Sequence, residues 1–269
     1  MHRGLYAAAS AMIVQESMHD VVANNLANVS SSGFRRRIPV NKSFPEVLMD
    51  RIEKKSEDGE IKLVAPPFQL GLKGKFLIGD LSLANVISET YMSTEFGGLQ
   101  VTDNPFDAAI VGDGYFAVQD GAGNTYYTRS GHFQKNEEGQ LATHDGMLVL
   151  GDGGPVEVGD AVSFTITETG NIIADGQLVD VLQVFTFENP TYLRQVGRTA
   201  LAVTEDSGEP VPVEEIRLEP GALEMSNVNV VEEMVRMVEA HRAYESASKV
   251  LMTHDELTGK LITSFGGTN

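Results

Sequence analysis

The sequence predicts an α+β protein that combines a discontinuous terminal-helix coiled-coil domain with a mainly antiparallel β domain. Both ends of the chain carry long, proline-free segments whose apolar residues recur at helical spacing. The middle instead alternates short apolar runs with glycine-containing turns. We expect residues 1–33 and 226–269 to form the helical domain, residues 34–98 and 206–225 an irregular connecting arm, and residues 99–205 the β domain.

An amphipathic helix is predicted over residues 2–29, where Gly4 is the only glycine. Its large apolar side chains recur at three-, four- and seven-residue spacing, which places them on one face of a helix. Residues 28–33 (Asn-Val-Ser-Ser-Ser-Gly) are rich in side chains that compete with helix, and Gly33 can take the positive φ that ends one. The face that we expect to lie in an assembly interface consists of Leu5, Met12, Val22, Leu26 and Val29.

A second, longer helix is predicted from Asn229 to Phe265. Asn229 can cap its first turn, with Glu232 three residues on as in a capping box. Two seven-residue series follow, one starting at Val230 and one at Met234, with polar residues at several positions, as in an imperfect coiled-coil seam. The two helices are expected to pair with each other and with those of neighbouring subunits; packing on the sheet is the alternative. The assembly residues expected in this helix are Val230, Met234, Met237, Tyr244, Leu251, Ile262 and Phe265.

The central part of the chain shows the pattern of a β meander. Turn dipeptides such as Asp145-Gly146 and Asp175-Gly176 separate the apolar runs, and turns this frequent favour antiparallel strands over a βαβ sheet. In the arm before it, the charged run Arg51–Lys62 is expected to be exposed. The strand candidates are residues 108–118, 126–133, 141–150, 162–167 and 177–187.

The charge of the chain is strongly negative and unevenly placed. The net charge is -18. Residues 1–42 hold five Lys/Arg and two Asp/Glu, and residues 225–269 hold four and six, so residues 43–224 carry -19. A polyanionic surface repels phosphate backbones, which argues against a nucleic-acid partner. There is no cysteine, and therefore no disulfide framework or thiol nucleophile.

No motif in the sequence assigns a catalytic, cofactor-binding or metal-binding residue, and no small-molecule substrate is expected. The GxSxG and HExxH patterns are absent. Residues 120–124 resemble half a calcium loop, but Gly131 stands where that loop needs a bidentate glutamate. His19 and His241 fall on the apolar stripes of the two helices; they are interpreted as packed interface residues, with a ligand or pH-sensitive pair as the alternative.

Several ordered segments resemble the bacterial flagellar rod and hook family over nearly the whole chain. Small departures are Ala11, where a glycine is common, and Ser30-Ser31-Ser32, where Asn-Thr-Thr is frequent. The segments that carry the resemblance are Leu5–Met12, Ala23–Val29, Gly33–Arg35, Asp107–Val118, Tyr127–Gly131, Gly139–Leu141, Leu223–Val235 and Arg242–Glu245.

The resemblance implies a structural, non-enzymatic subunit of the flagellar basal-body rod without a cofactor. Such subunits cross the inner membrane through the flagellar type III export apparatus. No cleaved signal peptide is expected, because polar residues interrupt the apolar run after Arg3. They polymerise helically across the periplasm with copies of themselves and other axial proteins. The helices then form an inner tube with the β domain outside, and the rod transmits torque while its lumen passes later subunits.

The sequence alone leaves alternatives open for the subtype of the protein and for its function. The length suits the FlgF and FlgG types, and the segments Gly151–Pro155 and Asp255–Leu257 favour FlgF, the proximal-rod type. A periplasmic or surface polysaccharide hydrolase is a second hypothesis, with Asp113 and Glu137 as acid and base. A soluble adhesin-like binding module with a helical stalk is the third.

Overall fold

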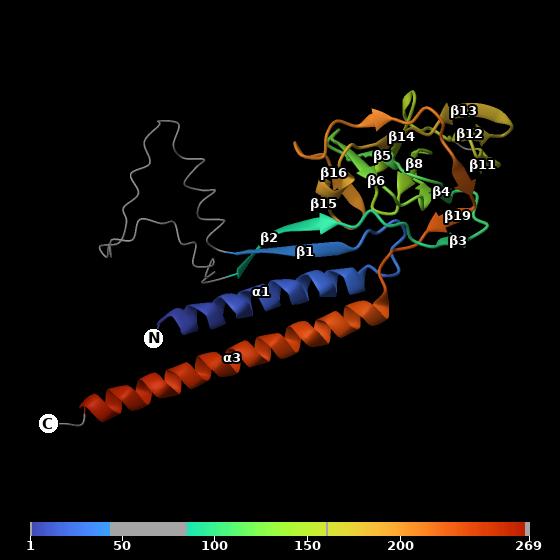
Figure 1. Cartoon of the computed structure of the whole chain (residues 1–269). Coiled ribbons are helices and arrows are strands. Elements are labelled where there is room, and N and C mark those ends of the chain that lie inside the picture. Colours follow the sequence, from blue (N-terminus) through green and yellow to red (C-terminus); the bar gives the residue numbers. More distant parts are fainter. Residues whose placement is uncertain (1, 44–84, 160, 267–269) are drawn as a thin grey trace, which may run out of the picture. The chain divides into compact units, whose positions relative to one another are not determined.

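The structure is a computed structural model that describes residues 2–43, 85–159 and 161–266. Figure 1 shows a long helix at each end of the described chain and strands between them. The strand pairings among residues 99–224, from β3 to β19, are antiparallel, which confirms the α+β class. The run Arg51–Lys62 lies outside the described residues, as does the rest of segment 44–84 of the predicted arm.

The helices occupy the segments that the sequence indicates. Helix α1 spans His2–Ala27 and helix α3 spans Val230–Gly266. The backbone N–H of Val231 donates to Asn229 Oδ1 at 3.0 Å, so Asn229 caps α3 as predicted. Gly33, six residues after α1 ends, has a φ of 68°.

The strands of the described residues are short and form one large sheet and four small ones. The large sheet follows the order β15-β16-β6-β5-β9-β8-β7, and β10, β14 and β17 pair at its side. The small sheets are β11-β12-β13, β18-β4, β19-β3 and β1-β2. The bounds are β1 Arg37–Ser43, β2 Asn85–Met92, β3 Leu99–Val101, β4 Ala108–Ile110, β5 Tyr115–Gln119, β6 Thr125–Thr128, β7 Phe133–Lys135, β8 Leu141–Thr143, β9 Leu148–Gly151, β10 Gly154–Pro155, β11 Phe164–Ile166, β12 Asn171–Ala174, β13 Gln177–Val181, β14 Val184–Thr186, β15 Arg194–Val196, β16 Ala200–Ala202, β17 Val211–Pro212, β18 Leu218–Pro220 and β19 Ala222–Glu224, with a 3₁₀ turn at Pro190–Tyr192.

Strand β5 lies at the centre of the core because both of its faces are buried. Phe116 and Val118 belong to the larger hydrophobic cluster, and Tyr115 and Ala117 belong to a second cluster on the other face. Alternate residues of a strand point to opposite faces, so a continuous apolar run fits a strand covered on both sides. The ring of Phe116 meets that of Phe133 edge-on at 5.2 Å.

The predicted strand candidates hold strands, but several of them are divided. Residues 141–150 form the hairpin β8–β9, because Asp145-Gly146 sits at its turn and Gly146 has a φ of 82°. Residues 108–118 likewise contain both β4 and β5. Strands β12, β15 and β16 lie outside the candidates. Short strands between tight turns give too few alternating residues for a clear sequence signal.

The chain separates into two compact units, which we call the helix unit and the β unit. The helix unit contains the described residues of Met1–Asp20, Pro39–Thr90 and Arg236–Asn269. The β unit contains Val21–Ile38 and Tyr91–Val235. The last residues of α1 and the first of α3 therefore belong to the β unit. The domain boundaries predicted from the sequence, with residues 99–205 as the β domain, differ from the two units and stay a prediction.

Candidate functional site

The face predicted on α1 is only partly covered by other residues of the described chain. Val22 is buried, and Leu5, Met12, Leu26 and Val29 are half-buried. The helix also buries Ala8 and Val14, which the sequence reasoning did not single out. On the opposite side, Tyr6 and Ile13 are exposed.

The structure covers only part of the seam that the sequence predicts on helix α3. Val230, Met237 and Leu251 are half-buried, and Tyr244 is 36% exposed. Met234 and Ile262 of the companion series are exposed, by 51% and 68%, and so is Phe265 at the end of the first series, by 79%. The covered face of α3 instead continues through Glu233 and Ala240, which are buried and seven residues apart.

The two terminal helices lie side by side and antiparallel within the helix unit. A Cβ added to Gly4, near the start of α1, would lie 2.9 Å from Nε2 of His254 on the second half of α3. Further along, residues of both helices line a groove of about 210 Å³. His19 and His241 both line this groove, together with Gln15, Glu16, Ala240 and Tyr244. Next to the groove, exposed His241 Nε2 is 3.4 Å from Glu245 Oε1.

Within the β unit, a buried ionic cluster centred on Glu224 joins segments that are far apart in the sequence. Arg35 Nη2 lies 2.7 Å from Glu224 Oε1, and Arg129 Nε donates to Glu224 Oε2 at 2.5 Å. At most 5% of each of the three side chains is exposed. The Phe96 ring stands 5.2–5.3 Å from both guanidinium carbons. Glu224 therefore ties the segment after α1 to the strands.

The two terminal nitrogens of Arg129 donate to backbone carbonyls at the end of β4 and in the loop that follows it. Its Nη2 donates to Ile110 O at 2.9 Å and Gly112 O at 2.6 Å, and Nη1 donates to Gly114 O. Burial lowers the pKa of Arg35, and the neighbouring Glu224 carboxylate opposes that shift. A buried cluster of this kind is a structural support, since the Glu224 carboxylate is directed at both guanidinium groups, although Arg35 Nε itself is buried without a hydrogen-bond partner.

Gly33 fits this cluster through a backbone contact that leaves no room for a side chain. Its N–H donates to Glu224 O at 2.7 Å, and its φ of 68° lies in the left-handed region. A Cβ there would lie 2.3 Å from Ser130 N. Sequence reasoning identified Gly33 as a helix-ending residue, whereas the close approach to Ser130 comes from the tertiary structure.

Gly33→Ala is therefore expected to lower the free energy of unfolding of the β unit by about 2–4 kcal/mol, from backbone strain and a steric clash together. Urea denaturation followed by circular dichroism measures the change. Gly121→Ala is the matched control, because a Cβ at Gly121 meets nothing within 4 Å. Equal midpoints for the two variants would contradict the assigned contact.

A second buried polar cluster holds the end of α1 against the start of α3. Asn25 Nδ2 donates to Glu233 Oε2 at 3.1 Å and to Arg37 O at 3.0 Å, and Asn25 Oδ1 accepts from Arg37 N at 2.9 Å. Arg36 Nη1 lies 3.8 Å from Glu233 Oε1. Asn25 is 1% exposed and Glu233 is fully buried. Polar residues at these positions do not stand out in the sequence as core residues.

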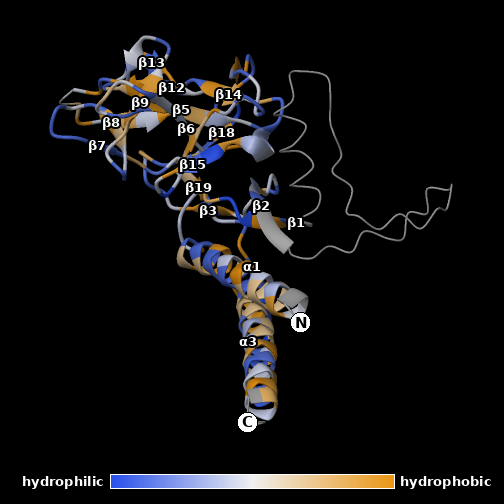
Figure 2. Cartoon of the chain, turned by 90° about the vertical axis from the view of Figure 1, so that its left-hand side faces the viewer, coloured by the Kyte–Doolittle hydropathy of each residue, from blue (hydrophilic) through white to orange (hydrophobic). Residues whose placement is uncertain are grey.

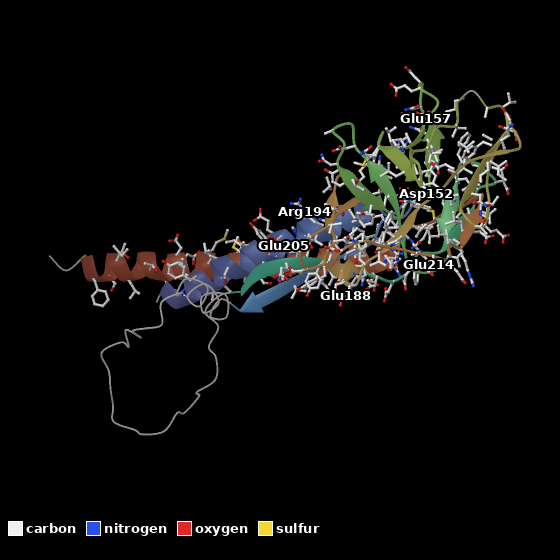
Figure 3. All side chains as sticks on the ribbon, turned by 90° about the horizontal axis from the view of Figure 1, so that it is seen from above. Asp152, Glu157, Glu188, Arg194, Glu205 and Glu214 are labelled. Carbon is white, nitrogen blue, oxygen red and sulfur yellow. The ribbon has the colours of Figure 1, made fainter. Side chains whose placement is uncertain are left out.

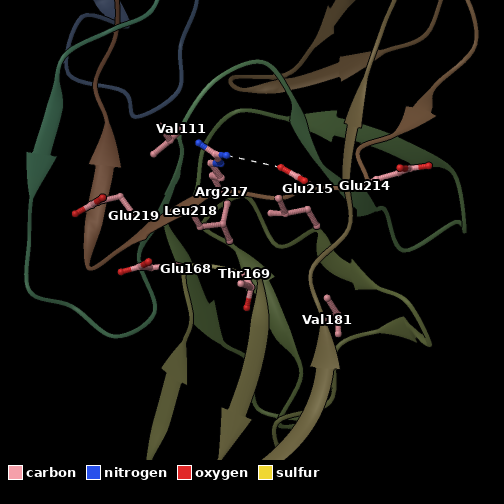
Figure 4. Close-up of a pocket in the computed structure, with 10 residues that line it drawn as sticks. Val111, Glu168, Thr169, Val181, Glu214, Glu215, Arg217, Leu218 and Glu219 are labelled. Atoms are coloured by element: carbon pink, nitrogen blue, oxygen red, sulfur yellow. Dashed lines mark ion pairs between the residues drawn. The ribbon is translucent and has the colours of Figure 1, made fainter.

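A wide cleft of the β unit is lined by several exposed acidic side chains. It measures about 780 Å³ and is lined by exposed glutamates, among them Glu168, Glu214 and Glu219 (Figure 4). The cleft contains an ion pair in which Arg217 Nη2 lies 3.7 Å from Glu215 Oε2, and both of these side chains are exposed to solvent. The carboxylates of the hydrolase hypothesis, Asp113 and Glu137, are exposed and lie outside this cleft.

The described residues contain no group of three or more His, Cys, Asp or Glu placed to hold a metal ion. The helices of the described chain also include none that is long and apolar enough to cross a membrane.

Three family models match the chain in order. Residues 5–35 match the flagella basal body rod protein model, residues 109–174 the flagellar hook protein FlgE/F/G D1 domain, and residues 219–264 the flagellar basal body rod FlgEFG protein C-terminal model. The first covers most of α1, the second lies in the β unit, and the third covers β19 and nearly all of α3.

Full-length relatives are similar along the whole chain. The flagellar basal-body rod protein FlgG of Caulobacter vibrioides is 34% identical over 95% of this chain and 96% of its own length. FlgG of Bacillus subtilis is 32% identical over 97% and 98%, and the flagellar hook-basal body complex protein FlhO of the same bacterium is 27% identical over 99% of both chains. The preference for the FlgF subtype drawn from the sequence receives no support from these relatives. With relatives above 30% identity along almost their entire length, the chain belongs to the flagellar basal-body rod protein family.

Proposed function

We propose that this protein is a structural subunit of the flagellar rod that polymerises helically with copies of itself and other axial proteins, through α1 and α3 paired as a coiled coil. It reaches the basal body through the flagellar type III export apparatus and keeps its N-terminal helix. It forms part of a rod that crosses the periplasm, transmits torque and conducts later subunits. The observation that carries the proposal is the apolar surface that the terminal helices leave uncovered.

That surface extends along much of α3. Residues coloured as hydrophobic recur along this helix in Figure 2. Complete burial of one large aliphatic side chain contributes ~1.5–3 kcal/mol, so a neighbouring subunit that covers several of them gains a substantial association energy. The exposed large apolar residues of the helix unit are Tyr6 and Ile13 on α1 and Val238, Tyr244, Val250, Met252, Leu257, Ile262 and Phe265 on α3.

The distribution of charge favours contact through the same segments. Residues 43–224 carry -19, whereas residues 1–42 and 225–269 carry +3 and -2. Figure 3 shows acidic side chains on the β unit, including Asp152, Glu157, Glu188, Glu205 and Glu214, all of them exposed. Two β units therefore repel each other, while two nearly neutral terminal segments approach without that repulsion.

Ile262→Asp tests the proposal, because Ile262 is 68% exposed in the single chain. A carboxylate at an exposed position costs the isolated protein little, whereas burial against a neighbour without a partner costs several kcal/mol. We expect the purified variant to keep the wild-type unfolding curve and to lose incorporation into basal bodies, measured by immunoblotting of isolated basal bodies and by motility.

The matched control for this experiment is Val162→Asp, which makes the same kind of aliphatic-to-carboxylate change at a 97% exposed position of the β unit. It is expected to leave incorporation intact. Normal motility with Ile262→Asp as the only copy would show that this part of α3 faces no neighbour.

A further inference from the structure

We infer that Asn25 and Glu233 act as a register-setting pair, which fixes how far α1 is displaced along α3 in the antiparallel helix pair. The inference rests on the proposed function, because the register decides which exposed apolar residues of the two helices stand next to each other on the assembly surface. Both are positioning residues; they act through the helices that carry the contacts.

The pair joins the two helices directly and inside the core of the β unit. Its hydrogen bond, Asn25 Nδ2 to Glu233 Oε2, measures 3.1 Å and links residues that are 208 positions apart. Two further bonds between Asn25 and the backbone of Arg37 hold the amide in one orientation. Glu233 is anchored in the first turn of α3, where its N–H donates to Asn229 O at 3.0 Å. Neither side chain can follow a sliding helix without losing these partners.

The contact at the other end of the helix pair has the same register. Gly4 is the residue that meets His254. On α1, Asn25 lies 21 residues after Gly4 (25 − 4). On α3, His254 lies 21 residues after Glu233 (254 − 233). At 1.5 Å per residue this is ~32 Å along both axes. Equal and opposite advances of three heptads are what a regular antiparallel pair requires, and both contacts satisfy one register.

The other residues on the covered faces specify this register weakly. Ala8 on α1 and Ala240 on α3 are buried small residues, and Ala247 follows Ala240 by one heptad. Small side chains with a seven-residue repeat fit nearly as well after a shift of one heptad, about 10.5 Å. A buried amide–carboxylate pair fits only one position, because any shift leaves a buried carboxylate without its donor.

Cysteine cross-linking reads the register, and the chain is well suited to it because it has no cysteine of its own. Three double-cysteine variants of the full-length chain are purified, each containing Gly4→Cys. The second cysteine replaces His254, or the residue one heptad before it (Ala247→Cys), or the residue one heptad after it (Leu261→Cys). A short bis-maleimide is then added. With Glu233 in place, the 4/254 product is expected to exceed each of the other two by at least about tenfold, a factor that corresponds to ~1.4 kcal/mol.

Glu233→Leu removes the carboxylate and keeps a side chain of similar size. In this background the 4/247 and 4/261 products are expected to rise at least about tenfold relative to 4/254, while the circular-dichroism melting curve still shows a folded β unit. Glu233→Gln is the rescue control: its side-chain oxygen still accepts from Asn25 Nδ2, so the preference for 4/254 returns.

An unchanged preference for 4/254 in Glu233→Leu would overturn the inference, because the connections held by Glu224 would then set the register. If Glu233→Leu does not fold, Glu233→Met replaces it, and failure of both to fold would assign the pair to stability and also overturn the inference. These outcomes are independent of Ile262→Asp, which tests incorporation and leaves the register unchanged.

Discussion

Replacing Glu224 with alanine is expected to lower the free energy of unfolding of the β unit by about 3–5 kcal/mol. The substitution leaves the guanidinium groups of Arg35 and Arg129 buried without their shared carboxylate. It also removes the acceptor of the Gly97 N–H, which donates to Glu224 Oε1 at 3.0 Å. An uncompensated buried charge is costly because the protein interior screens it far less than water does.

Urea denaturation of the purified chain measures this effect, with tyrosine fluorescence as the probe because tryptophan is absent. Glu219→Ala is the control, since this exposed glutamate lies in the neighbouring strand β18 and its loss is expected to change stability by less than about 0.5 kcal/mol. A change below about 1 kcal/mol for Glu224→Ala would show that water reaches the cluster and that its charges are screened.

Deletion of residues 2–20 is expected to abolish incorporation into the rod and to leave the β unit folded. The deletion removes the part of α1 that belongs to the helix unit, including half-buried Leu5 and Met12, and ends before buried Val22 and Asn25. The covered face of α3 then lacks its partner helix, and the helix pair no longer presents a complete surface to a neighbour.

Two measurements separate assembly from folding in this deletion. Immunoblotting of isolated basal bodies reports incorporation, and the cooperative melting of the purified deletion variant reports the β unit. Secretion of the variant into the medium shows whether export still occurs. Incorporation of the deletion variant at the wild-type level would show that residues 2–20 of α1 are not needed for assembly.

Much of the fold is visible in the sequence, because it depends on local signals. The helix boundaries follow from hydrophobic spacing and from the cap at Asn229, and the hairpins follow from Asp-Gly turns such as Asp145-Gly146 and Asp175-Gly176. Such signals act over a few residues, so no knowledge of the rest of the chain is needed to interpret them.

The buried polar clusters could not be predicted in the same way. Glu224 and Arg129 are hydrogen-bonded although they lie 95 positions apart in the sequence, and Asn25 and Glu233 although they lie 208 apart. A glutamate in a helix is ordinarily a surface residue, so Glu233 gave no sign of being fully buried. Its heptad spacing to Ala240 was a usable signal, since both belong to the covered face of α3 whereas Met234 points outward.

Electron cryo-microscopy of isolated basal bodies that contain this protein tests the central claim most directly. We expect an open helical array in which residues 2–27 and 230–266 form an inner tube around a lumen and the β unit lies outside it. Burial of the now exposed Ile262 and Phe265 between neighbouring copies would identify the assembly surface. A closed oligomer, or an array held together by contacts between β units with the terminal helices free, would contradict it.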